Sequence, residues 1–174
     1  MKQCSFEFMN NFRHSFGGSL LEGKRKTART LSTKRPIHLI LKTSHSRFFN
    51  PGNRPLVDLI QGWASRFKIK VLRTSLNWTH IHMIILIPSR SAYNAFIRAV
   101  TAAIVQKICK AKGPTFKGIF ELRPFTRILS WGKDLKNVFA YHDLNDLEAF
   151  GYIKREKKSK ICKKVKENEG RKRT

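Results

Sequence analysis

The stretch that decides the fold is Trp78-Thr79-His80-Ile81-His82-Met83-Ile84-Ile85-Leu86-Ile87-Pro88, an apolar run that carries two histidines. As a β-strand it alternates between two faces, so one row holds the histidines and the other row is almost purely apolar. Side chains two positions apart stand about 7 Å apart along a strand, close enough for two imidazoles to bind one metal ion. We therefore expect the apolar row to pack against helices and the histidines to lie on the opposite, more open face.

Strand-like and helical patterns alternate on both sides of this run. Apolar strand formers occupy 37–42, and apolar residues recur at helical spacing from Pro55 to Phe67. Residues 69–76 form a strand that a tight connection joins to 78–88, and a helix over 91–111 follows. A strand over 120–129, which Pro124 would confine to a sheet edge or a bulge, precedes a last helix over 133–150.

The resulting order, βαββαβα, predicts an α+β fold. It corresponds to a ferredoxin-like or RRM-like antiparallel sheet of four strands, with two helices on one face and the first and third strands in the centre. The histidine strand is then central, and the added C-terminal helix follows the fourth strand, where it can fold across the open face.

The chain of 174 residues suits one domain, and its 36 Lys and Arg against 11 Asp and Glu give a formal net charge of +25. Such a charge predicts a polyanionic partner, with nucleic acid as the leading candidate. The basic residues concentrate in an N-terminal arm, 1–35, which we expect to order only on binding, and in a C-terminal tail, 154–174. The folded domain is then 36–153, and the arm contributes Lys24, Arg25 and Lys26 as candidate nucleic-acid contacts.

The remaining composition indicates the compartment. The longest apolar stretch is far shorter than the roughly 20 residues of a membrane-spanning helix, so no membrane association is expected. Cys4, Cys109 and Cys162 lie far apart, without the spacing of a disulfide framework or a zinc ribbon. They are typical of reduced thiols, and we expect a cytoplasmic protein.

Tyr141 and Asn145 are the best candidates to face the two histidines, because they lie one helical turn apart on the last predicted helix. Tyr93 and Tyr152 are the competing tyrosines, but neither has a ligand-like residue four positions later on a helix. His142 should face solvent or phosphate, about 100° around the helix from Tyr141.

Other candidates are more easily explained without chemistry. His38 should be structural or close to DNA rather than a further ligand, and an isolated His-x-His pair is often satisfied by hydrogen bonds alone. Arg123 and Arg127 frame the fourth predicted strand and could follow a DNA backbone, although surface arginines need no such explanation.

These residues resemble a known family. His80-Ile81-His82 matches the HUH motif (histidine, bulky hydrophobe, histidine). Tyr141-His142-Asp143-Leu144-Asn145, followed by Leu147-Glu148-Ala149-Phe150-Gly151, resembles the tyrosine helix of single-tyrosine HUH transposases. The closest similarity is to the REP-associated tyrosine transposases, bacterial relatives of the smallest insertion-sequence transposases. It spans about 37–153 and includes Arg123-Pro124-Phe125-Thr126-Arg127.

The resemblance implies a metal-dependent enzyme that cleaves and rejoins single-stranded, hairpin-forming DNA. Mg²⁺ or Mn²⁺ would be held by His80, His82 and Asn145, and Tyr141 would attack the phosphate to form a 5′-phosphotyrosine and a free 3′-OH. Insertion-sequence members more often have glutamine where this chain has Asn145. The resemblance also implies a bacterial, nucleoid-associated protein, either a monomer or a homodimer that completes its site across two chains.

Two alternatives remain open from the sequence. A non-catalytic nucleic-acid-binding protein with an RRM-like fold would share the same sheet, although RNA binders of this kind display aromatic residues where this chain has histidines. A replication or conjugation initiator would share the chemistry, but such enzymes are usually larger and often place the motif and the tyrosine differently.

Overall fold

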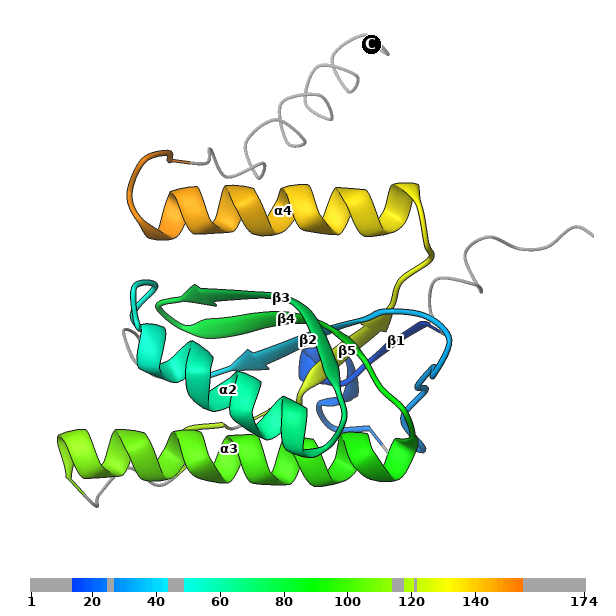
Figure 1. Cartoon of the computed structure of the whole chain (residues 1–174), viewed down its shortest axis with the longest axis horizontal. Helices are drawn as coiled ribbons and strands as arrows, with labels where there is room; N and C mark the ends of the chain where they lie inside the picture. Colours follow the sequence, from blue (N-terminus) through cyan, green and yellow to red (C-terminus); the bar gives the residue numbers. More distant parts are fainter. Residues whose placement is uncertain (1–13, 25–26, 44–48, 114–117, 121, 155–174) are drawn as a thin grey trace, which may run out of the picture.

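The computed structural model describes residues 14–24, 27–43, 49–113, 118–120 and 122–154 (Figure 1). The strands are β1 (Ser15–Phe16), β2 (Ile37–Lys42), β3 (Lys70–Asn77), β4 (His80–Leu86) and β5 (Phe125–Ile128). The helices are the 3₁₀ helix η1 (Gly18–Leu21) and the α-helices α2 (Arg54–Arg66), α3 (Arg90–Lys112) and α4 (Lys133–Ala149). The predicted α+β class is confirmed.

The strands form one antiparallel sheet in the order β1-β5-β2-β4-β3. As expected, the histidine strand β4 is internal and pairs with β2 on one side and β3 on the other. The sheet has five strands rather than four, because Ser15 and Phe16 pair with Arg127 and Thr126. This part of the predicted N-terminal arm belongs to the sheet, whereas the boundaries at 35 and 153 stay predictions because 1–13 and 155–174 lie outside the described residues.

The fourth predicted strand is shorter than 120–129, and it is not an edge strand. It begins at Phe125, directly after Pro124, whose nitrogen has no hydrogen to donate to a neighbouring strand. It then pairs with β2 on one side and β1 on the other. The chain can pass so close because Gly17, at φ 90°, has no Cβ to collide with the carbonyl of Pro124.

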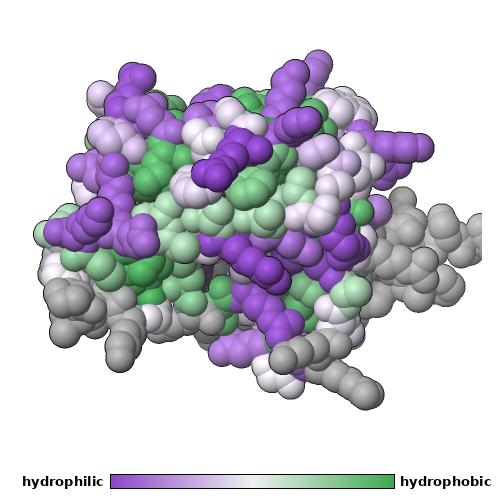
Figure 2. Space-filling model, turned by 60° about the horizontal axis from the view of Figure 1, so that its bottom comes forward, coloured by the Kyte–Doolittle hydropathy of each residue, from purple (hydrophilic) through white to green (hydrophobic). Residues whose placement is uncertain are grey.

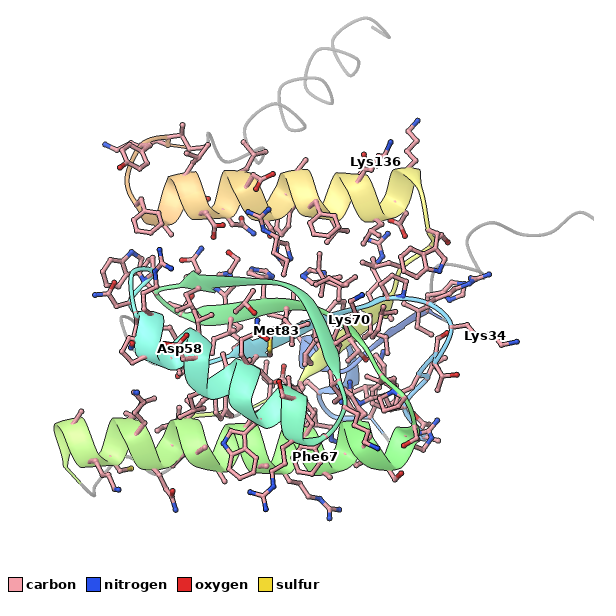
Figure 3. All side chains as sticks on the ribbon, in the orientation of Figure 1. Lys34, Asp58, Phe67, Lys70, Met83 and Lys136 are labelled. Atoms are coloured by element: carbon pink, nitrogen blue, oxygen red, sulfur yellow. The ribbon has the colours of Figure 1, made fainter. Side chains whose placement is uncertain are left out.

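Helices α2 and α3 cover one face of the sheet (Figure 1). Asn53 begins α2 by accepting a hydrogen bond from the Leu56 amide at 3.2 Å, and Ser89 begins α3 in the same way with Ala92 at 3.1 Å. The predicted apolar row of β4 lies in this core, in which Ile81, Met83 and Ile85 are fully buried. Figure 3 labels Met83, and shows side chains filling the layers on both sides of the sheet. The prediction that the apolar row of β4 packs against helices is confirmed.

Helix α4 crosses the opposite face of the sheet, above β3 and β4 (Figure 1). Its first turn is fixed by Asp134, which accepts hydrogen bonds from Arg127 at 2.6 Å and from the Ser130 amide at 3.0 Å. Its second half is fixed by Asp146, which accepts a short hydrogen bond from the Ser75 hydroxyl and pairs with Arg73 at 3.2 Å. These polar contacts at both ends set the position of the helix along the strands.

The outer surface mixes polar and apolar residues. Figure 2 shows the side of the molecule to which α3 belongs, where hydrophilic and hydrophobic patches alternate. Among the described residues, no helix combines the length and the apolar character needed to cross a bilayer.

Replacing Asp146 by alanine should loosen α4, because the change removes the acceptor for Ser75 and one of the two carboxylates that pair with Arg73. We expect the free energy of unfolding to fall by about 1–3 kcal/mol, the usual cost of leaving a partly buried polar group without its partner. Chemical denaturation measures this, and the exposed Asp58 on α2 gives a charge-matched control, Asp58→Ala. Equal losses in the two variants would contradict the role given to Asp146.

Candidate functional site

The two histidines of β4 point to the same face of the sheet, beneath α4. The rings of His80 and His82 meet edge to face, with centroids 4.5 Å apart. His82 is 2% exposed and His80 is half-buried. The face that the sequence predicted to be more open is therefore covered by the helix above it.

Tyr141 and Asn145 reach these histidines from α4. The ring of Tyr141 lies edge-on to the ring of His82 at 5.7 Å, and 42% of Tyr141 is exposed. Nδ2 of Asn145, which is buried, lies 3.5 Å from Nε2 of His82. The structure thus brings together the four residues that the sequence selected, from positions about sixty residues apart in the chain.

Two further histidines, which the sequence analysis did not assign to the site, complete a buried cluster. Nε2 of His38 lies 3.1 Å from Nδ1 of His82 and 3.3 Å from Nε2 of His142. His142 is 0% exposed, so the prediction that it faces solvent or phosphate is wrong. Its burial could have been predicted from its helical spacing to Val138, Asn145 and Ala149, with which it forms the buried stripe of α4.

The two ring nitrogens of His82 have different partners. Since an amide nitrogen only donates, Nδ2 of Asn145 makes Nε2 of His82 an acceptor, and the ring proton then lies on Nδ1, facing His38. The lone pair on Nε2 therefore points toward Asn145 of α4. Nε2 of His38 accepts the hydrogen bond from Nδ1 and so orients the ring of His82.

Burial disfavours the charged forms of His38, His142 and His80 by lowering the pKa of each. Burial, followed by the nearby charges of His142 and Arg127, lowers the pKa of His38 to about 3. Burial and then Arg73 lower the pKa of His142 to about 4, against the opposing effect of Asp146 and Asp143. The pKa of His80 is also lowered, by burial first and by Lys42 second. Neutral imidazoles have the free lone pair that metal binding requires.

Two sets of ligand atoms meet at His82 and could hold a metal ion. On the inner side, nitrogens of His38, His82 and His142 all lie within 4.8 Å of one another. On the outer side, Nε2 of His82 faces Asn145, and His80 stands beside it. The inner set is closed on all sides by protein, whereas a catalytic ion needs an open position for its substrate. The ring of Tyr141 lies 5.7 Å from that of His82, which both sets share, and 6.5 Å from that of His142.

The competing tyrosines lie elsewhere. Tyr93 is 2% exposed and belongs to the core under α2 and α3, on the other face of the sheet. Burial raises its pKa to about 12, which opposes formation of the phenolate. Tyr152 is exposed beyond the end of α4.

The predicted DNA contacts have different environments. Arg127 pairs with Asp134 and so helps to position α4, while Arg123 and Lys24 lie at the surface. Arg25 and Lys26 lie outside the described residues. The contact of Arg127 with α4 gives this residue a structural role in addition to the predicted one.

Of the comparisons with known proteins, the one with solved structures gives matches. No protein-family model matches the chain, and a search of curated proteins gives no match. Among solved structures, a "putative transposase" from Deinococcus radiodurans R1 is 15% identical and covers 70% of this chain and 98% of its own, with a TM-score of 0.45. A REP-associated tyrosine transposase bound to a REP hairpin is 14% identical and covers 74% of this chain and 76% of its own, with a TM-score of 0.52. The second likeness shows a shared fold with the family that the residues resemble.

The buried histidines predict how stability depends on pH. Since the folded chain holds the pKa of His38 near 3 and that of His142 near 4, below the usual histidine value of about 6.5, the unfolded chain binds more protons in acid. At a pH above the histidine pKa of the unfolded chain, the two residues leave the free energy of unfolding independent of pH. Below it, each should lower the free energy of unfolding by up to about 1.4 kcal/mol per pH unit, until the pH reaches the folded pKa.

Denaturation in EDTA, compared between the wild-type chain and His142→Gln, measures this effect. The variant keeps a polar side chain but cannot take up a proton, so its stability should fall less steeply between about pH 6.5 and the folded pKa of His142. Parallel pH profiles would show that His142 titrates alike in both states.

Proposed function

We propose that this protein cleaves and rejoins single-stranded DNA by means of Tyr141, as a single-tyrosine HUH transposase or a host-adapted relative. The observation that carries the proposal is the convergence of Tyr141 and Asn145, from α4, on His80 and His82, from β4. The shared fold with a REP-associated tyrosine transposase supports it. So does the order β5-β2-β4-β3, which is the order expected of a ferredoxin-like sheet with an added edge strand.

In the proposed reaction the phenol oxygen of Tyr141 attacks a backbone phosphorus atom. A bond forms between this oxygen and phosphorus, the bond from phosphorus to the 3′ oxygen breaks, and the freed oxygen takes up a proton as a 3′-OH. The phenol proton passes to water, since Tyr141 is partly exposed. The 5′-phosphotyrosine conserves the energy of the broken bond, so a 3′-OH can reverse the step and join DNA.

The outer ligand set fits the divalent ion that such chemistry uses. Nε2 of His82, a nitrogen of His80 and the amide oxygen of Asn145, once this amide has turned over, would hold Mg²⁺ or Mn²⁺. The bound ion would polarise the phosphate and offset the negative charge that develops during attack. Nδ1 of His80 lies 2.9 Å from Thr79 Oγ1, a contact that leaves Nε2 of the ring for the metal.

Charge supports DNA as the substrate. The chain carries +25, Lys42 pairs across the strands with His80, and Asp143 and Asp146 of α4 are engaged by Arg73. Arg73 thus offsets the negative charge of two carboxylates of α4, whereas the charge of Glu148 on the same helix acts on His80 against the effect of Lys42. The structure with the shared fold holds a REP hairpin, and we propose a hairpin with single-stranded flanks as the substrate here as well. Because the four residues meet within one chain, we propose that a monomer suffices.

The nucleophile is tested by nicking of a labelled library of hairpin oligonucleotides with single-stranded flanks, in Mn²⁺. Tyr141→Phe keeps the ring against His82 but removes the attacking oxygen, so cleavage should fall by at least about a thousandfold. Tyr152→Phe is the matched control and should cut at the wild-type rate. If the Tyr141 variant cuts as fast as the wild-type chain, Tyr141 is not the nucleophile.

The metal assignment is tested by calorimetric titration of the full chain with Mn²⁺. His80→Gln removes a ligand of the outer set only and should weaken binding by at least about tenfold, whereas His142→Gln changes the inner set only and should change it by less than that. The opposite pattern would assign the ion to the inner set of His38, His82 and His142, and would remove the metal from contact with the DNA phosphate.

A further inference from the structure

A cavity of about 480 Å³ lies among β2, η1 and the segment that leads into β5. The residues proposed for metal binding and catalysis do not line this cavity, and α4 contributes no residue to it. It is mainly apolar, with two cationic side chains, and its lining consists of Ser15, Gly18, Ser19, Leu20, Ile40, Lys42, Leu122, Arg123 and Phe125.

The register of the strands places the floor of this cavity beside the histidines. Ile40 pairs with His82 on one side and with Phe125 on the other, and Lys42 pairs with His80. Directly opposed residues of antiparallel strands share a face and have Cβ atoms about 4.5–5.5 Å apart. The floor therefore lies on the histidine face of the sheet, one strand away from His80 and His82.

The walls of the cavity are preformed. The amide of Gly18 donates to the carbonyl of Arg123 at 2.9 Å, which ties η1 to the segment before β5. Arg29 fixes the same segment by donating to the Pro124 carbonyl and to Thr126 Oγ1, both at 2.8 Å. A ligand would thus enter a space that the folded chain already holds open.

The lining has the chemistry of a nucleotide site. The ring of Phe125 and the side chains of Ile40 and Leu122 offer apolar surface to a flat aromatic base, and base stacking of this kind accepts single-stranded DNA. Lys42 and Arg123 provide positive charge for the backbone phosphates. Lys42 pairs across the strands with His80, so the cationic wall lies beside the histidine that we propose as a metal ligand.

We propose that this cavity binds the base of a nucleotide next to the phosphate that Tyr141 attacks, and so selects the cleavage position. The proposal rests on the proposed function, because the histidine pair must be the point where the phosphate sits. Base binding one strand away would fix the DNA strand in register with the phenol, and would discriminate among flanking bases.

The test uses the cleavable hairpin from the nicking assay, with an abasic residue placed in turn on either side of the cut. Loss of one base should lower the cleavage rate of the wild-type chain by about 10- to 100-fold, which matches the usual contribution of one stacked base to binding. Ser19→Trp, at an exposed wall position, should fill the cavity and make cleavage insensitive to that abasic residue. Gln106→Trp is the control. Gln106 lies on α3 and lines a neighbouring cavity of about 590 Å³, which shares only Lys42 and Leu122 with the first, so this variant should keep the wild-type sensitivity.

A binding measurement separates this proposal from the proposed function. Each flanking base of the same hairpin is replaced in turn by 2-aminopurine, and its fluorescence is followed on binding to the Tyr141→Phe chain, with and without Ser19→Trp. A change at one position that Ser19→Trp abolishes supports the cavity, even if no variant cuts DNA. Equal fluorescence responses with and without Ser19→Trp would overturn the proposed base site. So would equal sensitivity to abasic residues in the wild-type chain and in Ser19→Trp. Neither result would bear on Tyr141 as the nucleophile.

Discussion

The docking of α4 across β3 and β4 is the constraint on which the site depends. Asp146 joins the helix to Ser75 and Arg73, and Ser75 is the residue that pairs across the strands with His82. The preceding residue on the helix is Asn145, so the same contact that fixes the helix also points the amide at the histidine. A helix held at both ends by carboxylates leaves Tyr141 little freedom to move along the strands.

Burial has a second consequence in a chain of this charge. A protein with a net charge of +25 already disfavours further positive charge, and burial makes the protonation of His38 and His142 costly. The low pKa values of these two residues keep them neutral under the helix, while lysines and arginines such as Lys24 and Arg123 occupy the surface.

Much of this arrangement was predictable from local patterns. The alternation in β4 assigned its apolar row to the core, and the spacing of Tyr141 and Asn145 placed them together on one helix. Strand β1 was not predictable, because two residues have no periodicity and their pairing with β5 depends on a tertiary contact. The prediction for His142 was wrong because it assumed that the buried stripe of α4 is centred on Tyr141. Tyr141 lies at the border of this stripe, and His142 lies within it. His38 likewise became part of the site only through the pairing of β2 with β4.

In the proposed reaction, α4 brings Tyr141 to a phosphate held at His80 and His82. Peptide mapping by mass spectrometry tests it most directly, after the full chain has reacted with the hairpin library in Mn²⁺ and the covalent complex has been digested. A nucleotide attached to the peptide that contains Tyr141 is the predicted result. Attachment to the peptide of Tyr93 or Tyr152, or DNA cut without any covalent protein product, would contradict it.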